Sequence, residues 1–121
     1  DRRQDLQTPI WRHRATFTWA TGDGHAAQTV TIAKLNGLIQ GVVISISEVT
    51  ANPTVTVTLA DDLSGQIGSF ATLADGTVHV KDSSDFDNIP VAGNVVISVD
   101  PSADPGGAAQ TLTVIVELRG T

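Results

Sequence analysis

The chain has 121 residues, the size of one domain, and no cysteine, so it has neither a disulfide framework nor a thiolate zinc site. It carries 7 Lys and Arg against 13 Asp and Glu, a formal net charge of −6, which argues against a protein that wraps nucleic acid. No apolar run approaches the roughly 18 residues of a membrane span, and the first residues do not form a signal-peptide pattern.

The charge is unevenly distributed along the chain. Residues 1–14, DRRQDLQTPIWRHR, hold four Arg and two Asp, so this segment is +2 (4 − 2) and the remainder is −8 (3 − 11). Pro9 keeps the segment extended, and Ile10 and Trp11 are poor choices for a permanently solvated tail. We therefore predict an extended basic arm over residues 1–14 and a β-sandwich domain over residues 15–121. The residues expected to contact a partner are Arg2, Arg3, Ile10, Trp11, Arg12 and Arg14.

Eight short segments of the body alternate apolar and polar residues with a period of two, which is the pattern of half-buried strands. In chain order they are residues 15–20, 28–35, 41–49, 53–60, 64–73, 76–82, 94–100 and 111–119. Turn-forming Gly, Pro, Asn and Asp residues separate most of them. Residues 32–39, IAKLNGLI, would suit a short helical turn, but Gly37 and Gly41 disfavour it.

The alternation also predicts which side chains face the core. These are Phe17 and Trp19 in the first strand, Val42, Ile44 and Ile46 in the third, Val55, Val57 and Leu59 in the fourth, and Leu112, Val114, Val116 and Leu118 in the last.

Strands with one apolar face must bury that face against a second sheet or close into a barrel. We predict an all-β fold, an antiparallel two-sheet sandwich of jelly-roll type with about eight strands, and keep a barrel as the alternative. The segment PTVTVTLA carries no charge, so at a sheet edge it would invite contact with another subunit.

One acidic stretch, DSSDFDN, is a weak candidate for Ca²⁺ binding through Asp82, Asp85 and Asp87. Its spacing is not that of an EF-hand and no Glu closes it, so an Asx-rich turn between strands is the simpler interpretation. We predict no metal site and no cofactor.

The chain also lacks the patterns of common catalytic sites. His13, His25 and His79 do not have zinc-ligand spacing. No GxSxG elbow is present, and TGDGH lacks the Lys and the spacing of a phosphate-binding loop. We therefore predict that the protein is not an enzyme.

Two longer segments carry a family resemblance: ANPTVTVTLAD at residues 51–61 and SDFDNIPVAGNVVISVDPSADPGGAAQTLTVIVELRG at residues 84–120. In their order along the chain and in their Thr-, Val- and Gly-rich composition they resemble the small all-β virion proteins of tailed bacteriophages, of the head cement or decoration type. The resemblance covers most of the body and leaves out the arm.

The resemblance implies a structural role without catalytic residues. Such proteins are made in the host cytoplasm and sit on the capsid surface as oligomers, often trimers, where they clamp neighbouring major capsid proteins. The expected partners are therefore the major capsid protein and further copies of this chain, with a trimer favoured and neither nucleic acid nor membrane involved. A tail, neck or fibre module that binds a receptor or glycan is the alternative, although few aromatic residues are available to stack on sugars.

Overall fold

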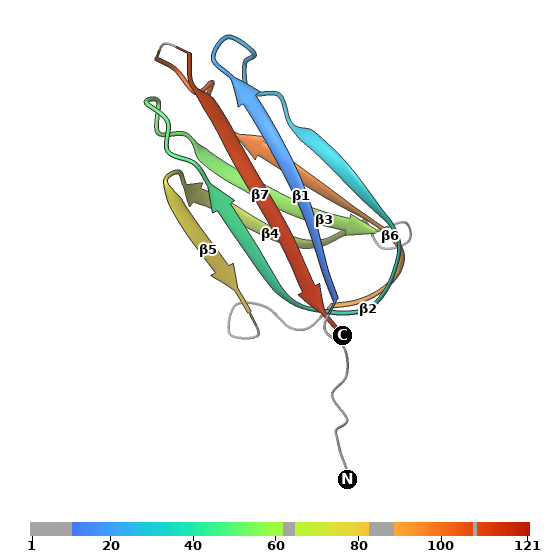
Figure 1. Ribbon diagram of the computed structural model, residues 1–121. Helices are drawn as coiled ribbons and strands as arrows, with labels where there is room; N and C mark the ends of the chain where they lie inside the picture. Colours follow the sequence, from blue (N-terminus) through green and yellow to red (C-terminus); the bar gives the residue numbers. More distant parts are fainter. Residues whose placement is uncertain (1–10, 62–64, 83–88, 108) are drawn as a thin grey trace.

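The computed structural model describes residues 11–61, 65–82, 89–107 and 109–121, and these form antiparallel β-structure (Figure 1). The seven strands are β1 (Trp11–Ala20), β2 (Gln28–Ile46), β3 (Thr54–Asp61), β4 (Gly65–Ala74), β5 (Thr77–Lys81), β6 (Ile89–Pro101) and β7 (Thr111–Gly120). The described residues contain no helix with the length and apolar character that a membrane crossing would need.

The long strand β2 belongs to both layers of the structure. Its first part, Gln28 to Ile39, pairs with β6, and its second part pairs with β7 from Ile39 to Ile46 and with β5 from Val42 to Ile46. The hydrogen-bonded path β1-β7-β2-β6-β3-β4 therefore folds over at β2. One layer contains β1, β7, β2 and β5, and the other contains β2, β6, β3 and β4, as Figure 1 shows.

The pairing is that of a jelly roll. When β2 is counted as two segments, the first segment pairs with the eighth, the second with the seventh, the third with the sixth and the fourth with the fifth. This nested order, a long hairpin rolled into two facing sheets, defines the jelly-roll sandwich. The predicted fold class is therefore confirmed.

The expected count of eight strands becomes seven because residues 28–35 and 41–46 belong to one continuous strand, β2, rather than to two, and residues 47–49 lie beyond its end. The segment 32–39 forms no helical turn. Instead, the register against β6 shifts between Ile32 and Leu35, Lys34 adopts φ 57°, and Gly37 adopts φ 137°. A bulge and a glycine thus bend the strand while it remains paired.

The core lies between the two layers and is built from the predicted apolar faces. All the core residues expected from the alternation are buried, from Phe17 and Trp19 in β1 to Leu118 in β7. β6 supplies Val95, Ile97 and Val99 from the other layer. Ile39, which pairs with both β6 and β7, is fully buried where the two layers meet.

The bend of β2 packs tightly against the last residues of the chain. The Leu38 amide donates to the Thr121 carbonyl at 2.9 Å, and the Thr121 amide donates to the Leu38 carbonyl at 3.1 Å. A Cβ at Gly120 would collide with the Leu38 carbonyl oxygen, and one at Gly37 would collide with the Thr121 carbonyl oxygen. Both positions therefore require glycine for close backbone approach.

We predict that Gly120→Ala lowers the free energy of unfolding by about 2 kcal/mol, because the added methyl group forces two strands apart. Gly41→Ala is the matched control, since a Cβ there makes only ordinary contacts with Lys81 and Arg119. Urea denaturation of both variants measures the difference. Equal losses for the two variants would contradict the steric account of the bend.

Candidate interaction surface

The structure places half of the residues predicted to contact a partner. Arg2, Arg3 and Ile10 lie outside the described residues. Trp11, Arg12 and Arg14 lie in β1, directly opposite Gly120, Arg119 and Glu117 of β7. The expected boundary between arm and domain at residue 14 is therefore corrected, because β1 already begins at Trp11.

Trp11 belongs to the domain and does not project from the tip of an arm. Its side chain is half-buried and packs against the core, beside Gly37 and Gly120 at the bend of β2. Its ring centroid lies 5.5 Å from that of His13. Among the described residues, none forms a hydrogen bond with the buried indole Nε1, so the contacts of this side chain there are apolar packing.

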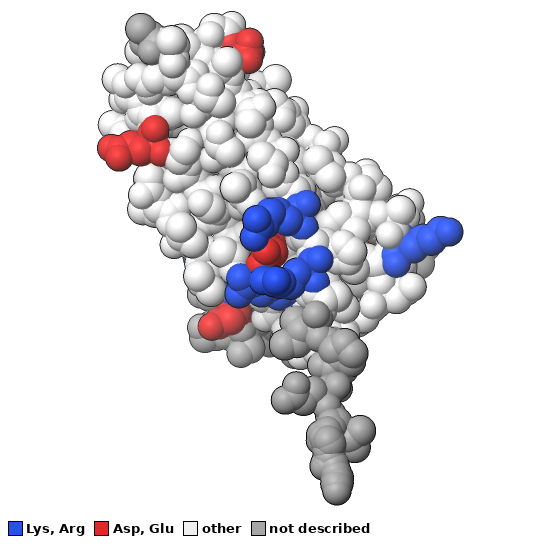
Figure 2. Space-filling model, viewed as in Figure 1, with Lys and Arg blue, Asp and Glu red and all other residues white. Residues whose placement is uncertain are grey.

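Arg14 and Arg119 share one buried carboxylate, that of Glu117. An Arg14 guanidinium nitrogen lies 3.0 Å from Oε2 of Glu117, and Nε of Arg119 lies 2.6 Å from its Oε1. The Glu117 side chain is 6% exposed, whereas those of Arg14 and Arg119 are 62% and 46% exposed. Figure 2 shows Lys and Arg side chains gathered around an acidic group on the face that carries β1 and β7.

The electrostatics of this cluster follow from its hydrogen bonds. The bonds from Arg119 and then Arg14 stabilise the charged form of Glu117 and lower the pKa of its carboxyl group below the ordinary value of 4.5. Two arginines around one carboxylate leave an excess positive charge. Arg12, which is exposed and opposite Arg119, adds to it.

We predict that Glu117→Gln lowers the free energy of unfolding by about 1 kcal/mol at pH 7, because both arginines lose their ion-pair partner. Since the folded pKa of Glu117 is lowered, its stabilisation is complete above pH 4.5 and is lost as the pH falls below that value. Thermal or urea unfolding at several pH values measures this difference from wild type. Asp100→Asn, at an exposed site on β6, is the control, and a difference that persists unchanged in strong acid would refute the ion-pair account.

Apolar side chains continue the same outward face toward β5. Val43 of β2 lies between Glu117 and Val80 in the pairing, and Val78 is opposite Ser45. Val78 and Val80 are 62% and 61% exposed. We call the outward side of β1, β7, β2 and β5 the front face, defined by Arg12, Arg14, Glu117, Arg119, Ile115, Val43, Val78 and Val80.

At the end of the sandwich away from the bend of β2, Asp104 ties two loops together. Its carboxylate accepts hydrogen bonds from the amides of Gly22 and Gly24 at 3.0 Å and from that of Gly106 at 2.9 Å. The Gly106 bond is the main cause of a lowered pKa for Asp104, and burial opposes it. The loop that follows β1 is thereby fixed to the loop between β6 and β7.

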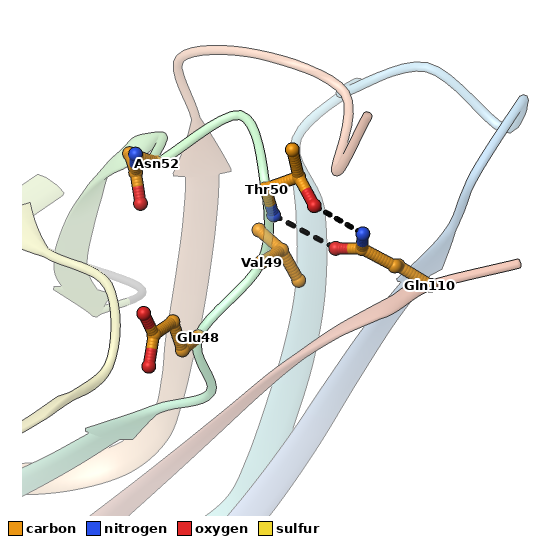
Figure 3. Close-up of a pocket in the computed structure, with 5 residues that line it drawn as sticks. All are labelled: Glu48, Val49, Thr50, Asn52 and Gln110. Atoms are coloured by element: carbon orange, nitrogen blue, oxygen red, sulfur yellow. Dashed lines mark hydrogen bonds between the residues drawn. The ribbon is translucent and has the colours of Figure 1, made fainter. Parts of the chain in front are cut away.

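A third loop is held to the same end through Gln110. The Thr50 backbone amide donates to Oε1 of Gln110 at 2.7 Å, and the side-chain Nε2 of Gln110 donates to the Thr50 hydroxyl group. Figure 3 shows these two bonds. Both residues also line a hollow of about 370 Å³. The hollow is lined by Glu48, Val49, Thr50, Asn52 and Gln110. This set is mostly polar and contains no aromatic ring.

The weak calcium candidate is only partly described. Asp82 is exposed directly after β5, whereas Asp85 and Asp87 lie outside the described residues. Among the residues that are placed, no group of three or more His, Cys, Asp or Glu side chains is arranged to hold a metal ion.

Two features of the surface go beyond the predictions from the sequence. The alternating pattern predicts only that Glu117 lies in a strand, although its position two residues before Arg119 puts both side chains on one face. The pairing of Glu117 with Arg14 depends on which strand lies beside β7, and the sequence pattern carries no such information.

Comparisons with known proteins give likenesses at low identity. No protein-family model and no curated protein sequence matches the chain. Among solved structures, a mitogen from Yersinia pseudotuberculosis is 8% identical, with a TM-score of 0.48 over 91% of this chain and 86% of the other. A protein in the structure of infectious bursal disease virus (Gx strain) is 13% identical, with a TM-score of 0.47 over 95% of this chain, which spans 33% of that protein.

A Bacillus endospore appendage protein, from a family of disulfide-linked pili, is 17% identical, with a TM-score of 0.39 over 100% of this chain and 96% of the other. At these identities and with TM-scores below 0.5, none of the likenesses carries an argument about function. The fold class stands on the strand pairing of the chain itself.

Proposed function

We propose that the protein is a structural subunit of a virus particle, a cement or decoration protein that binds and stabilises a capsid lattice. The observation that carries the proposal is the front face, where exposed arginines are held in place by a buried Glu117 beside apolar side chains. The resemblance of residues 51–61 and 84–120 to phage decoration proteins supports the same role.

The front face suits binding without chemistry. Arginine forms forked hydrogen bonds to carboxylates, and Glu117 already orders Arg14 and Arg119, so less conformational entropy is lost when a partner binds. The neighbouring Ile115 and Val43 add apolar area to a flat sheet surface. Such a surface fits a partner that presents acidic side chains next to apolar ones.

Five of the six residues predicted from the sequence to contact a partner keep that role here. Residues 1–10, with Arg2, Arg3 and Ile10, would extend the contact beyond the domain, and Arg12 and Arg14 would contribute from the front face. Trp11 is left out, because it packs against the core of its own domain. The arm and the front face are joined at β1, so one partner could contact both.

We expect the pair Arg12→Ala and Arg14→Ala to weaken binding to purified capsid shells by about tenfold or more, because desolvated arginines dominate such contacts. Co-sedimentation with shells measures the affinity. The matched control, Arg2→Ala with Arg3→Ala, removes the same charge and should have the smaller effect. Equal losses that vanish in high salt would mean that the arginines act only as diffuse charge.

Truncation separates the arm from the domain. Removing residues 1–10 should leave the circular dichroism spectrum and unfolding midpoint unchanged, whereas removing residues 1–14 should lower the midpoint because Trp11 and the Arg14–Glu117 pair are lost.

The location of the protein in the particle is tested separately, by quantifying it in the separated heads and tails of purified particles. Its presence in tails alone would rule out the capsid role.

A second candidate function, receptor or glycan binding, is favoured only by the polar hollow at the loop end. Glu48, Asn52 and Gln110 offer donors and acceptors there, on loops fixed by Asp104 and Thr50. A glycan array probed with the purified protein tests it. Binding that is lost in Asn52→Gly, which removes the side chain but tolerates the positive φ of 49° at this position, would establish this function.

A further inference from the structure

The two layers present four edge strands, and three of them are protected against pairing with another chain. β4 has two register shifts against β3, at Val55/Val57 and at Leu59/Ala60. The first part of β2 carries the shift between Ile32 and Leu35. β1 is regular, but Arg12 and Arg14 project from its outward side. Bulges and charges of this kind are the usual means of blocking an edge.

β5 is the fourth edge, and its only formally charged residue, Lys81, stands at the end of the strand. Its register with β2 is unbroken from Thr77 to Lys81. Its outward side carries Val78 and Val80, the two most exposed large apolar residues among those described. The Thr77 hydroxyl group donates to the Ala74 carbonyl at 2.6 Å, which anchors the start of the strand. The outward side of this edge is therefore apolar between Val78 and Val80, and its pairing with β2 is regular.

We propose that β5 pairs with β5 of a second copy, in antiparallel orientation around a two-fold axis, to join two front-face layers into one continuous sheet. The inference does not rest on the proposed capsid role. A second copy fits this edge because antiparallel pairing of β5 with itself places Val78 opposite Val80 and keeps the two Lys81 side chains apart.

Only one register places side chains of the same face opposite each other and also pairs every residue of β5. Residues directly opposite each other in a sheet point to the same face. When β5 pairs with itself, the residue numbers of each opposite pair must therefore add up to an even number. With His79 opposite His79 of the second copy, Val78 lies opposite Val80 and Thr77 opposite Lys81, and all five residues of β5 are paired. A shift by one residue in each copy leaves the end residues of β5 unpaired.

This register places apolar residues together and separates like charges. Val78 and Val80 of the two copies form a four-residue apolar cluster on the outward side, next to Val43 of each copy. Each lysine faces a threonine. Because five residues a side bury less than the roughly 1,000 Å² of a stable interface, the dimer should be weak and concentration-dependent.

Engineered cysteines test the register directly, because the natural chain has none. On mild oxidation, His79→Cys should form a disulfide with itself, and Val78→Cys should react with Val80→Cys when the two variants are mixed. Either of these valine variants alone should give little product, because its thiols would lie on a diagonal about 7–8 Å apart. Thr16→Cys on β1, the other edge of the same layer, is the control.

Sedimentation equilibrium supplies a second measurement. Wild-type protein should dimerise as its concentration rises, and Val80→Lys should weaken that association by about tenfold, because the lysine replaces two cross-strand contacts per dimer. Val80 is 61% exposed, so the variant should fold normally, and Thr16→Lys should leave association unchanged.

Several results would overturn the proposal. These are a wild-type protein that stays monomeric, an oligomer insensitive to Val80→Lys, and disulfide yields from the β5 variants that are no higher than the yield from Thr16→Cys. A monomer that binds capsid shells and loses that binding in Val80→Lys would assign the β5 edge to the capsid protein instead of a second copy.

Discussion

The bend in β2 is the constraint on which the rest of this jelly roll depends. Because one strand pairs with β6 before the bend and with β7 and β5 after it, the two layers share a backbone and cannot be placed independently. The bend works only where Gly37 and Gly120 allow the backbone to approach Leu38 and Thr121 closely. Trp11 fills the remaining space, so both ends of the described chain meet at the bend.

The alternation of apolar and polar residues was sufficient to predict most of the strands and the side chains that they bury. A period of two reports which side chains share a face, and Val55, Val57 and Leu59 are buried as that pattern requires. It could not show that residues 28–46 form one strand, because Asn36 and Gly37 suggest an interruption. The bulge at Lys34 is maintained by tertiary pairing with β6, and the local sequence does not encode it.

The candidate surface was harder to predict from the sequence, because it too depends on tertiary pairing between distant strands. Composition showed that the first fourteen residues are basic, and Arg12 and Arg14 are indeed exposed on the front face. Composition could not show that β1 lies beside β7, and this neighbour relation converts Arg14 into a partner of Glu117. Sequence-distant residues, 103 positions apart, form the cluster, so only the fold reveals it.

The position of Trp11 opposite Gly120 has a mechanical consequence. A force applied through residues 11 and 121 would act at one corner of the sandwich, on two antiparallel neighbours, and β1 is an edge strand. The hydrogen bonds between β1 and β7 would then break one after another, as in a zipper, and resist weakly. A force that separates the two layers would instead act on the packed core and on the bend of β2, which is the backbone connection shared by both layers. The edge strand β1 is therefore the part of the described fold that a force on residue 11 would detach first.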